Sequence, residues 1–111
     1  MEEAALGAVI SKMEYREFEE GADIVTQGAA ASWLAVIMRG TATVYHDGAE
    51  VRQFGSLDVI GESALVSDGH RRGTTVRATS AVGVLVLSRE RYRGLLEDGT
   101  LSQQTLSLIH I

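Results

Sequence analysis

The fold class is decided by residues 41–54, which read TATVYHDGAEVRQF. Two segments rich in β-branched and aromatic residues, 41–45 and 49–54, lie on either side of a short polar turn. In that turn Asp47 precedes Gly48, and glycine adopts the positive φ of a tight hairpin turn without steric cost. The stretch therefore predicts a β-hairpin.

Similar short segments continue the pattern on both sides of the hairpin. Glycines at positions 21, 28 and 40 separate segments 15–18, 23–26 and 33–39, and segments 73–79 and 81–87 follow. The last of these is almost unbroken in its apolar character, which is typical of a strand buried on both faces. Roughly eight strands at this spacing predict a mainly β protein, a double-stranded β-helix or jelly-roll-like β-roll.

Two short helices are predicted at the ends of this roll. Within residues 2–13 the apolar positions recur at helical spacing, and no proline interrupts them. Residues 89–96 regain helical character after Ser88, a residue type suited to the N-cap, and Gly99 ends the segment. The expected architecture is helix, β-roll, helix.

Size and charge limit the classes of function. The 111 residues, 45% of them apolar, suffice for one domain with one core. Lys and Arg number 10 against 15 Asp and Glu, so a net charge of -5 argues against direct binding of nucleic acid. Cysteine is absent, and no signal peptide or long apolar segment is recognisable, so we expect a cytoplasmic protein without direct membrane contact.

Two segments, residues 60–65 (IGESAL) and 72–76 (RGTTV), have an order of residue types that indicates a binding site and not only packing. Gly61 would let the backbone approach a ligand, and a helical turn over 62–66 would point free N–H groups at an anion. Arg72 could hold two phosphate oxygens at once, and small neighbours would keep the backbone accessible. Glu62 accepts hydrogen bonds, which suits a ribose hydroxyl beside the phosphate.

This stretch resembles the phosphate-binding cassette of cyclic nucleotide-binding domains, in which Gly-Glu, a small residue, an apolar residue, a short loop and Arg recur. Upstream, Ile24-Val25, Gly28 and Gly40 match the family's first motif, and the resemblance covers about residues 5–97. The loop length is similar to that of the bacterial catabolite activator, which selects Arg72 over the surface charge Arg71. The resemblance implies a sensor for cAMP or cGMP, with no other cofactor, and the ligand-binding residues Gly61, Glu62, Ser63, Ala64, Arg72, Gly73 and Thr74.

Some positions depart from the family pattern. Gly73 stands where Ser, Ala or Thr is usual, and the absence of Thr there implies cAMP rather than cGMP. Leu57 replaces the usual Gly before Asp58, and Ala35 interrupts a bulky apolar strand. These departures leave an alternative open: a degenerate roll that binds no nucleotide and serves as a structural or dimerisation module of a transporter, hydrolase or regulator.

Enzymatic readings find little support in the sequence. His46, His70 and His110 are too widely spaced for the metal sites of jelly-roll enzymes, and no Gly-x-Ser-x-Gly motif occurs. We therefore predict neither a metal site nor a catalytic residue. The aromatic residues Trp33, Tyr45 and Tyr92 are expected to pack against the strands.

The family resemblance also implies a longer helix after the roll, which covers the base and connects to an output domain. The present chain ends soon after Gly99, so we expect the output domain, and a homodimer contact through that helix, to lie outside it. The last six residues, LSLIHI, equal the translation of a transposon-type sequencing adaptor (CTG TCT CTT ATA CAC ATC). We accordingly expect the domain to span residues 1–105 and residues 106–111 to be non-native.

Overall fold

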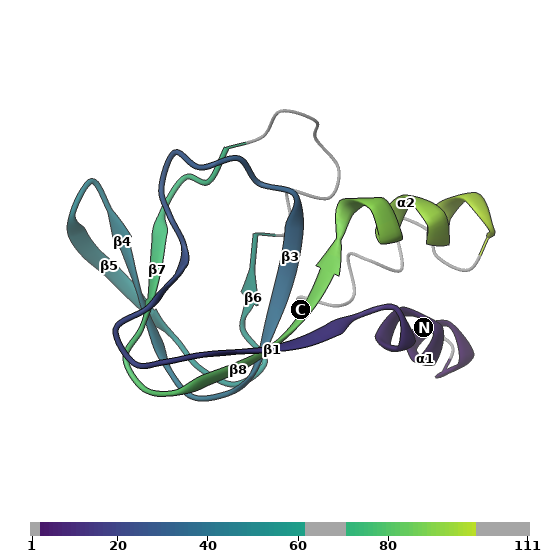
Figure 1. The fold of residues 1–111 in the computed structure, drawn as a ribbon, viewed down its shortest axis with the longest axis horizontal. Helices are drawn as coiled ribbons and strands as arrows, with labels where there is room; N and C mark the ends of the chain where they lie inside the picture. Colours follow the sequence, from purple (N-terminus) through teal and green to yellow (C-terminus); the bar gives the residue numbers. More distant parts are fainter. Residues whose placement is uncertain (1–2, 62–70, 100–111) are drawn as a thin grey trace.

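The computed structural model describes residues 3–61 and 71–99 and contains a β-roll with a helix at each end of its sequence (Figure 1). The predicted mainly β architecture is confirmed. In chain order the elements are α1 (Glu3–Ser11), β1 (Glu14–Phe18), β2 (Asp23–Val25), β3 (Trp33–Arg39), β4 (Ala42–His46), β5 (Ala49–Phe54), β6 (Val59–Ile60), β7 (Thr75–Ala78), β8 (Val82–Ser88) and α2 (Arg89–Glu97).

The strands form two four-stranded sheets, with the orders β1-β8-β3-β6 and β2-β7-β4-β5. All pairings between neighbouring strands are antiparallel. Because β6 belongs to the first sheet and β7 to the second, the chain changes sheets between them. The predicted cassette spans this crossing.

The predicted hairpin is the pair β4 and β5. Its turn has positive φ at both central residues, 51° at Asp47 and 82° at Gly48, as a type I′ turn requires. The Asp47 side chain also contacts the preceding part of the roll, because its Oδ1 accepts a hydrogen bond of 2.7 Å from Gln27 Nε2. The local turn signal therefore determined this part of the fold correctly.

Strand β8 is buried on both faces, as its apolar sequence predicts. Val84 packs between the two sheets with Ile37, whereas Leu87 faces the opposite way and packs with Leu34 against the helices. The second cluster also contains Val9 of α1 and Tyr92 and Leu95 of α2. Strand β8 thus contributes to both cores, and the predicted packing role of Tyr92 is confirmed.

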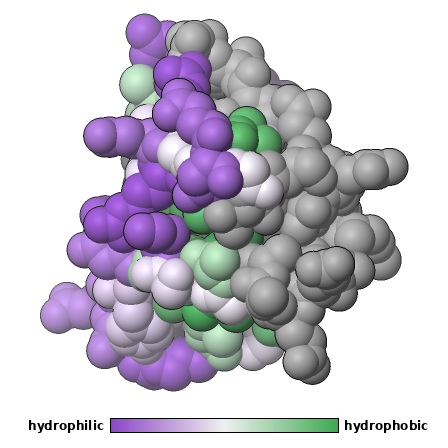
Figure 2. Space-filling model, turned by 90° about the vertical axis from the view of Figure 1, so that its right-hand side faces the viewer, coloured by the Kyte–Doolittle hydropathy of each residue, from purple (hydrophilic) through white to green (hydrophobic). Residues whose placement is uncertain are grey.

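Both helices lie at the same end of the roll (Figure 1). Helix α2 begins at the predicted N-cap, where Ser88 Oγ accepts a hydrogen bond of 3.2 Å from the Arg91 amide. Viewed from the end that carries the helices, hydrophilic residues cover the left side of the molecule, and apolar residues are visible beside them towards the middle (Figure 2). Neither of the two described helices is long and apolar enough to span a membrane.

Four details differ from the sequence prediction or lie beyond it. Strand β6 was not predicted, because two residues are too few to show a periodic pattern. Strand β7 begins at Thr75 rather than at position 73, and the predicted helical turn at 62–66 lies outside the described residues. Leu57, which replaces the family's glycine, adopts a φ of 72° and is 71% exposed.

Candidate functional site

The described part of the site lies where the ends of three segments meet. Gly61 directly follows β6, Arg72 precedes β7, and the connection between β2 and β3 runs beside them. The Arg72 amide donates to the Ala29 carbonyl at 2.9 Å, and the Arg72 carbonyl accepts from the Gly28 amide at 2.8 Å. The backbone of Arg72 is therefore held in an antiparallel pair with this connection.

The side chain of Arg72 is buried, with only 6% of the residue exposed. Its Nη2 donates a hydrogen bond of 2.7 Å to the carbonyl oxygen of Trp33. The guanidinium carbon also lies 4.5 Å from the centroid of the Trp33 ring, within the range of a cation–π contact. One residue therefore contacts both the edge and the face of the guanidinium.

The second terminal nitrogen of Arg72 faces Gly61. A Cβ atom built on Gly61 would lie 1.7 Å from Arg72 Nη1, and Gly61 has a φ of 76°. Both the close approach and the backbone conformation favour glycine over any other residue here. Nη1 itself is buried and has no hydrogen-bond partner among the described residues. A buried donor without a partner is costly, so this atom marks a place for an acceptor.

Arg72 is also without a carboxylate partner among residues 3–61 and 71–99, where the arginines in ion pairs are Arg16, Arg39 and Arg77. Burial lowers its pKa, because desolvation disfavours the charged form. Arginine nevertheless stays protonated at neutral pH, because its ordinary pKa lies far above it. The site therefore holds a buried positive charge that no described residue neutralises.

The structure distinguishes Arg72 from the adjacent Arg71. Arg71 is exposed, and its Nη1 donates to the Gly28 carbonyl at 3.1 Å. Only Arg72 directs its guanidinium at Gly61. The preference for Arg72, taken from the family's loop length, thus corresponds to the residue with the buried, incompletely satisfied side chain.

The other predicted site residues divide into two groups. Gly73 is exposed, with nothing within 4 Å of a built Cβ, and Thr74 is half-buried beside it. Glu62, Ser63 and Ala64 lie outside the described residues. Trp33 packs against the core as predicted, but its contact with Arg72 was not anticipated, because it joins residues 39 positions apart.

The same connection between β2 and β3 also contacts the start of α2. The Arg89 amide donates to the Ser32 carbonyl at 2.8 Å, and Arg89 Nη2 donates to the Ala31 carbonyl. Arg72 and Arg89 therefore hold neighbouring carbonyls of one short segment.

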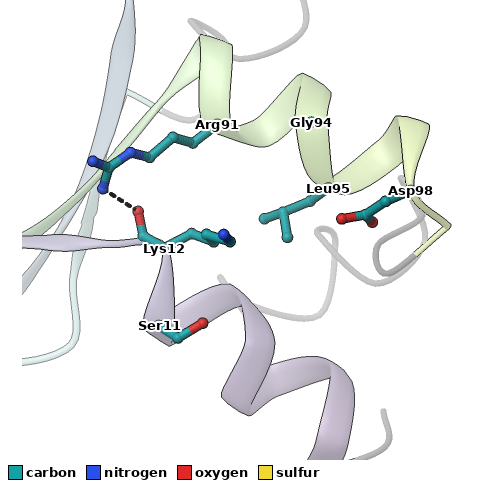
Figure 3. Close-up of a pocket in the computed structure, with 6 residues that line it drawn as sticks. All are labelled: Ser11, Lys12, Arg91, Gly94, Leu95 and Asp98. Carbon is teal, nitrogen blue, oxygen red and sulfur yellow. Dashed lines mark hydrogen bonds between the residues drawn. The ribbon is translucent and has the colours of Figure 1, made fainter.

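A separate pocket of about 390 Å³ lies between the end of α1 and α2 (Figure 3). Arg91 crosses one side of it and donates a hydrogen bond of 2.8 Å to the Lys12 carbonyl oxygen. Leu95 and Asp98 line it from α2. None of the described site residues lines this pocket, and we assign it to the packing of the two helices.

Comparison with known proteins agrees with this geometry. The family model described as "Cyclic nucleotide-binding domain" matches residues 15–98. A cAMP-dependent protein kinase regulatory subunit from Debaryomyces hansenii is 29% identical over 88% of the chain, which spans only 22% of that relative.

Two solved structures are also similar. A cyclic nucleotide-binding-like protein from Brucella abortus is 27% identical, with a TM-score of 0.78 over 84% of this chain and 83% of that one. The catabolite activator protein of Thermus thermophilus, 22% identical, has the same fold, with a TM-score of 0.83 over 98% of this chain and 53% of that one. The chain therefore belongs to the cyclic nucleotide-binding domain family.

Proposed function

We propose that the domain binds a cyclic mononucleotide, with cAMP preferred over cGMP, and that it regulates an output domain in a longer protein. The observation that carries the proposal is Arg72, a buried arginine whose Nη1 has no partner among the described residues. An anionic phosphate oxygen next to Gly61 would give this donor a charge-assisted hydrogen bond. The ligand would thus satisfy a group that the protein leaves unsatisfied.

The remaining contacts are assigned by chemistry and by the family pattern. In this proposal the backbone N–H groups of residues 61–64 and of Gly73 surround the phosphate, with Thr74 beside them, and Glu62 accepts a hydrogen bond from the ribose. Gly73 has no hydroxyl to offer a guanine base, which favours adenine. No cofactor besides the nucleotide is required.

The coupling to an output domain would pass through α2. Arg72 and Arg89 both bind carbonyls of the segment between β2 and β3, so the phosphate site and the start of α2 share one support. A ligand bound to Arg72 would favour the arrangement of this segment, and of α2, in which Arg72 faces the phosphate. Such a ligand shifts an existing equilibrium by its preference for one state.

Isothermal titration calorimetry of the chain with cAMP and cGMP tests the proposal. We expect saturable binding of one nucleotide per chain, weaker for cGMP, and a loss of binding in Arg72→Ala. Ligand at 100 times its Kd should also raise the free energy of unfolding by about 2.7 kcal/mol. Absence of binding to the wild type would contradict the proposal and favour the degenerate roll, and equal binding by Arg72→Ala would contradict the assigned site.

A further inference from the structure

The charge of Arg72 is buried and is not paired with a described carboxylate. A buried positive charge is costly unless other groups compensate for its lost hydration, and a carboxylate is the usual partner. No described carboxylate pairs with Arg72, and the adjacent segment 26–32, TQGAAAS, contains no acidic residue. Within residues 3–61 and 71–99, the groups that contact the guanidinium are therefore neutral.

Within the described residues those neutral groups belong to Trp33. Its carbonyl oxygen accepts the hydrogen bond from Arg72 Nη2 at 2.7 Å, and its ring lies under the guanidinium at 4.5 Å. An aromatic face attracts a cation through its quadrupole, and this attraction is stronger at a desolvated site than at the surface. Both contacts stabilise the cation without adding a negative charge.

This choice of partner matters for an incoming anion. A carboxylate on Arg72 would compete with a phosphate, because binding would require a buried ion pair to be broken. The Trp33 contacts occupy the face and Nη2, and they leave Nη1 directed at Gly61. The guanidinium is therefore oriented in advance, and no carboxylate of residues 3–61 and 71–99 neutralises its charge.

Trp33 itself is well placed to be a fixed support. It is the first residue of β3, where it pairs with Ser88 of β8, and it packs against the core between the sheets. Its position therefore depends on the rigid sheet and not on the ligand. A guanidinium that rests on such a support loses little conformational entropy when an anion binds.

We propose that Trp33 is a positioning residue for Arg72, and that its ring replaces a counter-ion in holding the guanidinium ready for an anion. The identity of that anion as a cyclic nucleotide phosphate rests on the proposed function. If Trp33 is removed, Arg72 will populate other rotamers, and the apparent Kd will rise by the inverse of the fraction that remains competent.

The test compares Trp33→Leu, Trp33→Phe and the control Tyr45→Leu by calorimetry with cAMP. Tyr45 is a matched control because its ring lies 5.1 Å from the guanidinium of Arg77 and is not the ring under Arg72. We expect Kd to rise about tenfold in Trp33→Leu. It should stay within about threefold of wild type in Trp33→Phe, which keeps an aromatic face, and should not change in Tyr45→Leu. An unchanged Kd in Trp33→Leu would overturn the proposal, as would an equal loss in Trp33→Phe.

A second measurement does not depend on nucleotide binding or on a variant that folds. In the nucleotide-free wild type, the side-chain protons of Arg72 should resonate upfield of those of Arg71, because they lie over the Trp33 ring. Trp33→Leu, where folded, should abolish this shift. If the wild type binds no nucleotide, the proposed function is wrong. The upfield shift of the Arg72 protons would still show whether the Trp33 ring holds the guanidinium. Absence of the shift in the wild type would overturn that role even if cAMP binds.

Discussion

Arg72 and Arg77 both lie over aromatic rings, but their surroundings differ in every other respect. The side chain of Arg77 is 45% exposed, and its Nε forms an ion pair with Asp23 at 2.7 Å. The hydrogen bond and charge of Asp23 raise the pKa of Arg77, whereas burial lowers that of Arg72. The ring under Arg77 is Tyr45 at 5.1 Å, and the ring under Arg72 is Trp33 at 4.5 Å.

This difference in burial and ion pairing indicates that Arg77 has a structural role, whereas Arg72 is suited to bind a ligand. The pair of Arg77 and Asp23 links β7 to β2 at the surface, where solvent screening leaves such a pair little effect on stability. Arg72 has a buried donor without a partner among the described residues. Such a donor does not stabilise the folded protein. We infer that the donor is retained because a ligand completes it.

The largest loss of cAMP affinity is expected when lysine replaces one of these two arginines. Arg72→Lys keeps the charge but loses the planar fork and the stack on Trp33, so cAMP affinity should fall about 100-fold. Arg77→Lys should leave the affinity unchanged, since Arg77 contacts Asp23 and not Gly61. Calorimetry on both variants measures the contrast. Similar losses in the two variants would remove the distinction between the arginines.

The next effect concerns two glycines with similar backbone conformations. Gly61 has a φ of 76° and Gly48 a φ of 82°, but a Cβ meets an atom within 4 Å only at Gly61. Gly61→Ala should displace the Arg72 guanidinium and lower cAMP affinity about tenfold, in addition to the backbone strain. Gly48→Ala should cost only the strain, about 1 kcal/mol in chemical unfolding. Equal affinity of the two variants would show that the contact of Gly61 with Arg72 has no role in binding.

The sequence predicts most of the fold and less of the site, for reasons that particular residues illustrate. The hairpin at Asp47 and Gly48 depends on neighbours in the chain, and the burial of β8 on both faces is visible in its own composition. By contrast, the stack of Trp33 on Arg72 joins distant residues, and no local pattern encodes it. The choice of Arg72 came from a family's loop length, and the structure supplies the physical contrast with Arg71.

The smallest effect separates stability from binding. Leu57 adopts a φ of 72° although it is 71% exposed, so its backbone is strained and its side chain gains little from burial. Leu57→Gly should raise the free energy of unfolding by about 0.5–1 kcal/mol, because glycine relieves the strain but loses more entropy on folding. Urea denaturation measures the gain, and cAMP affinity should not change. A destabilised variant would mean that the Leu57 side chain has contacts that outweigh the strain.

The most direct measurement of the central claim is an NMR titration of the chain, labelled with ¹⁵N at its arginine side chains, with cAMP. If Arg72 binds the phosphate, its guanidinium resonances will shift and saturate with the nucleotide, whereas those of Arg77 will stay in place. If cAMP binds while the Arg72 resonances remain unchanged, or if those of Arg71 shift in their stead, the unpartnered donor beside Gly61 is not the phosphate-binding group.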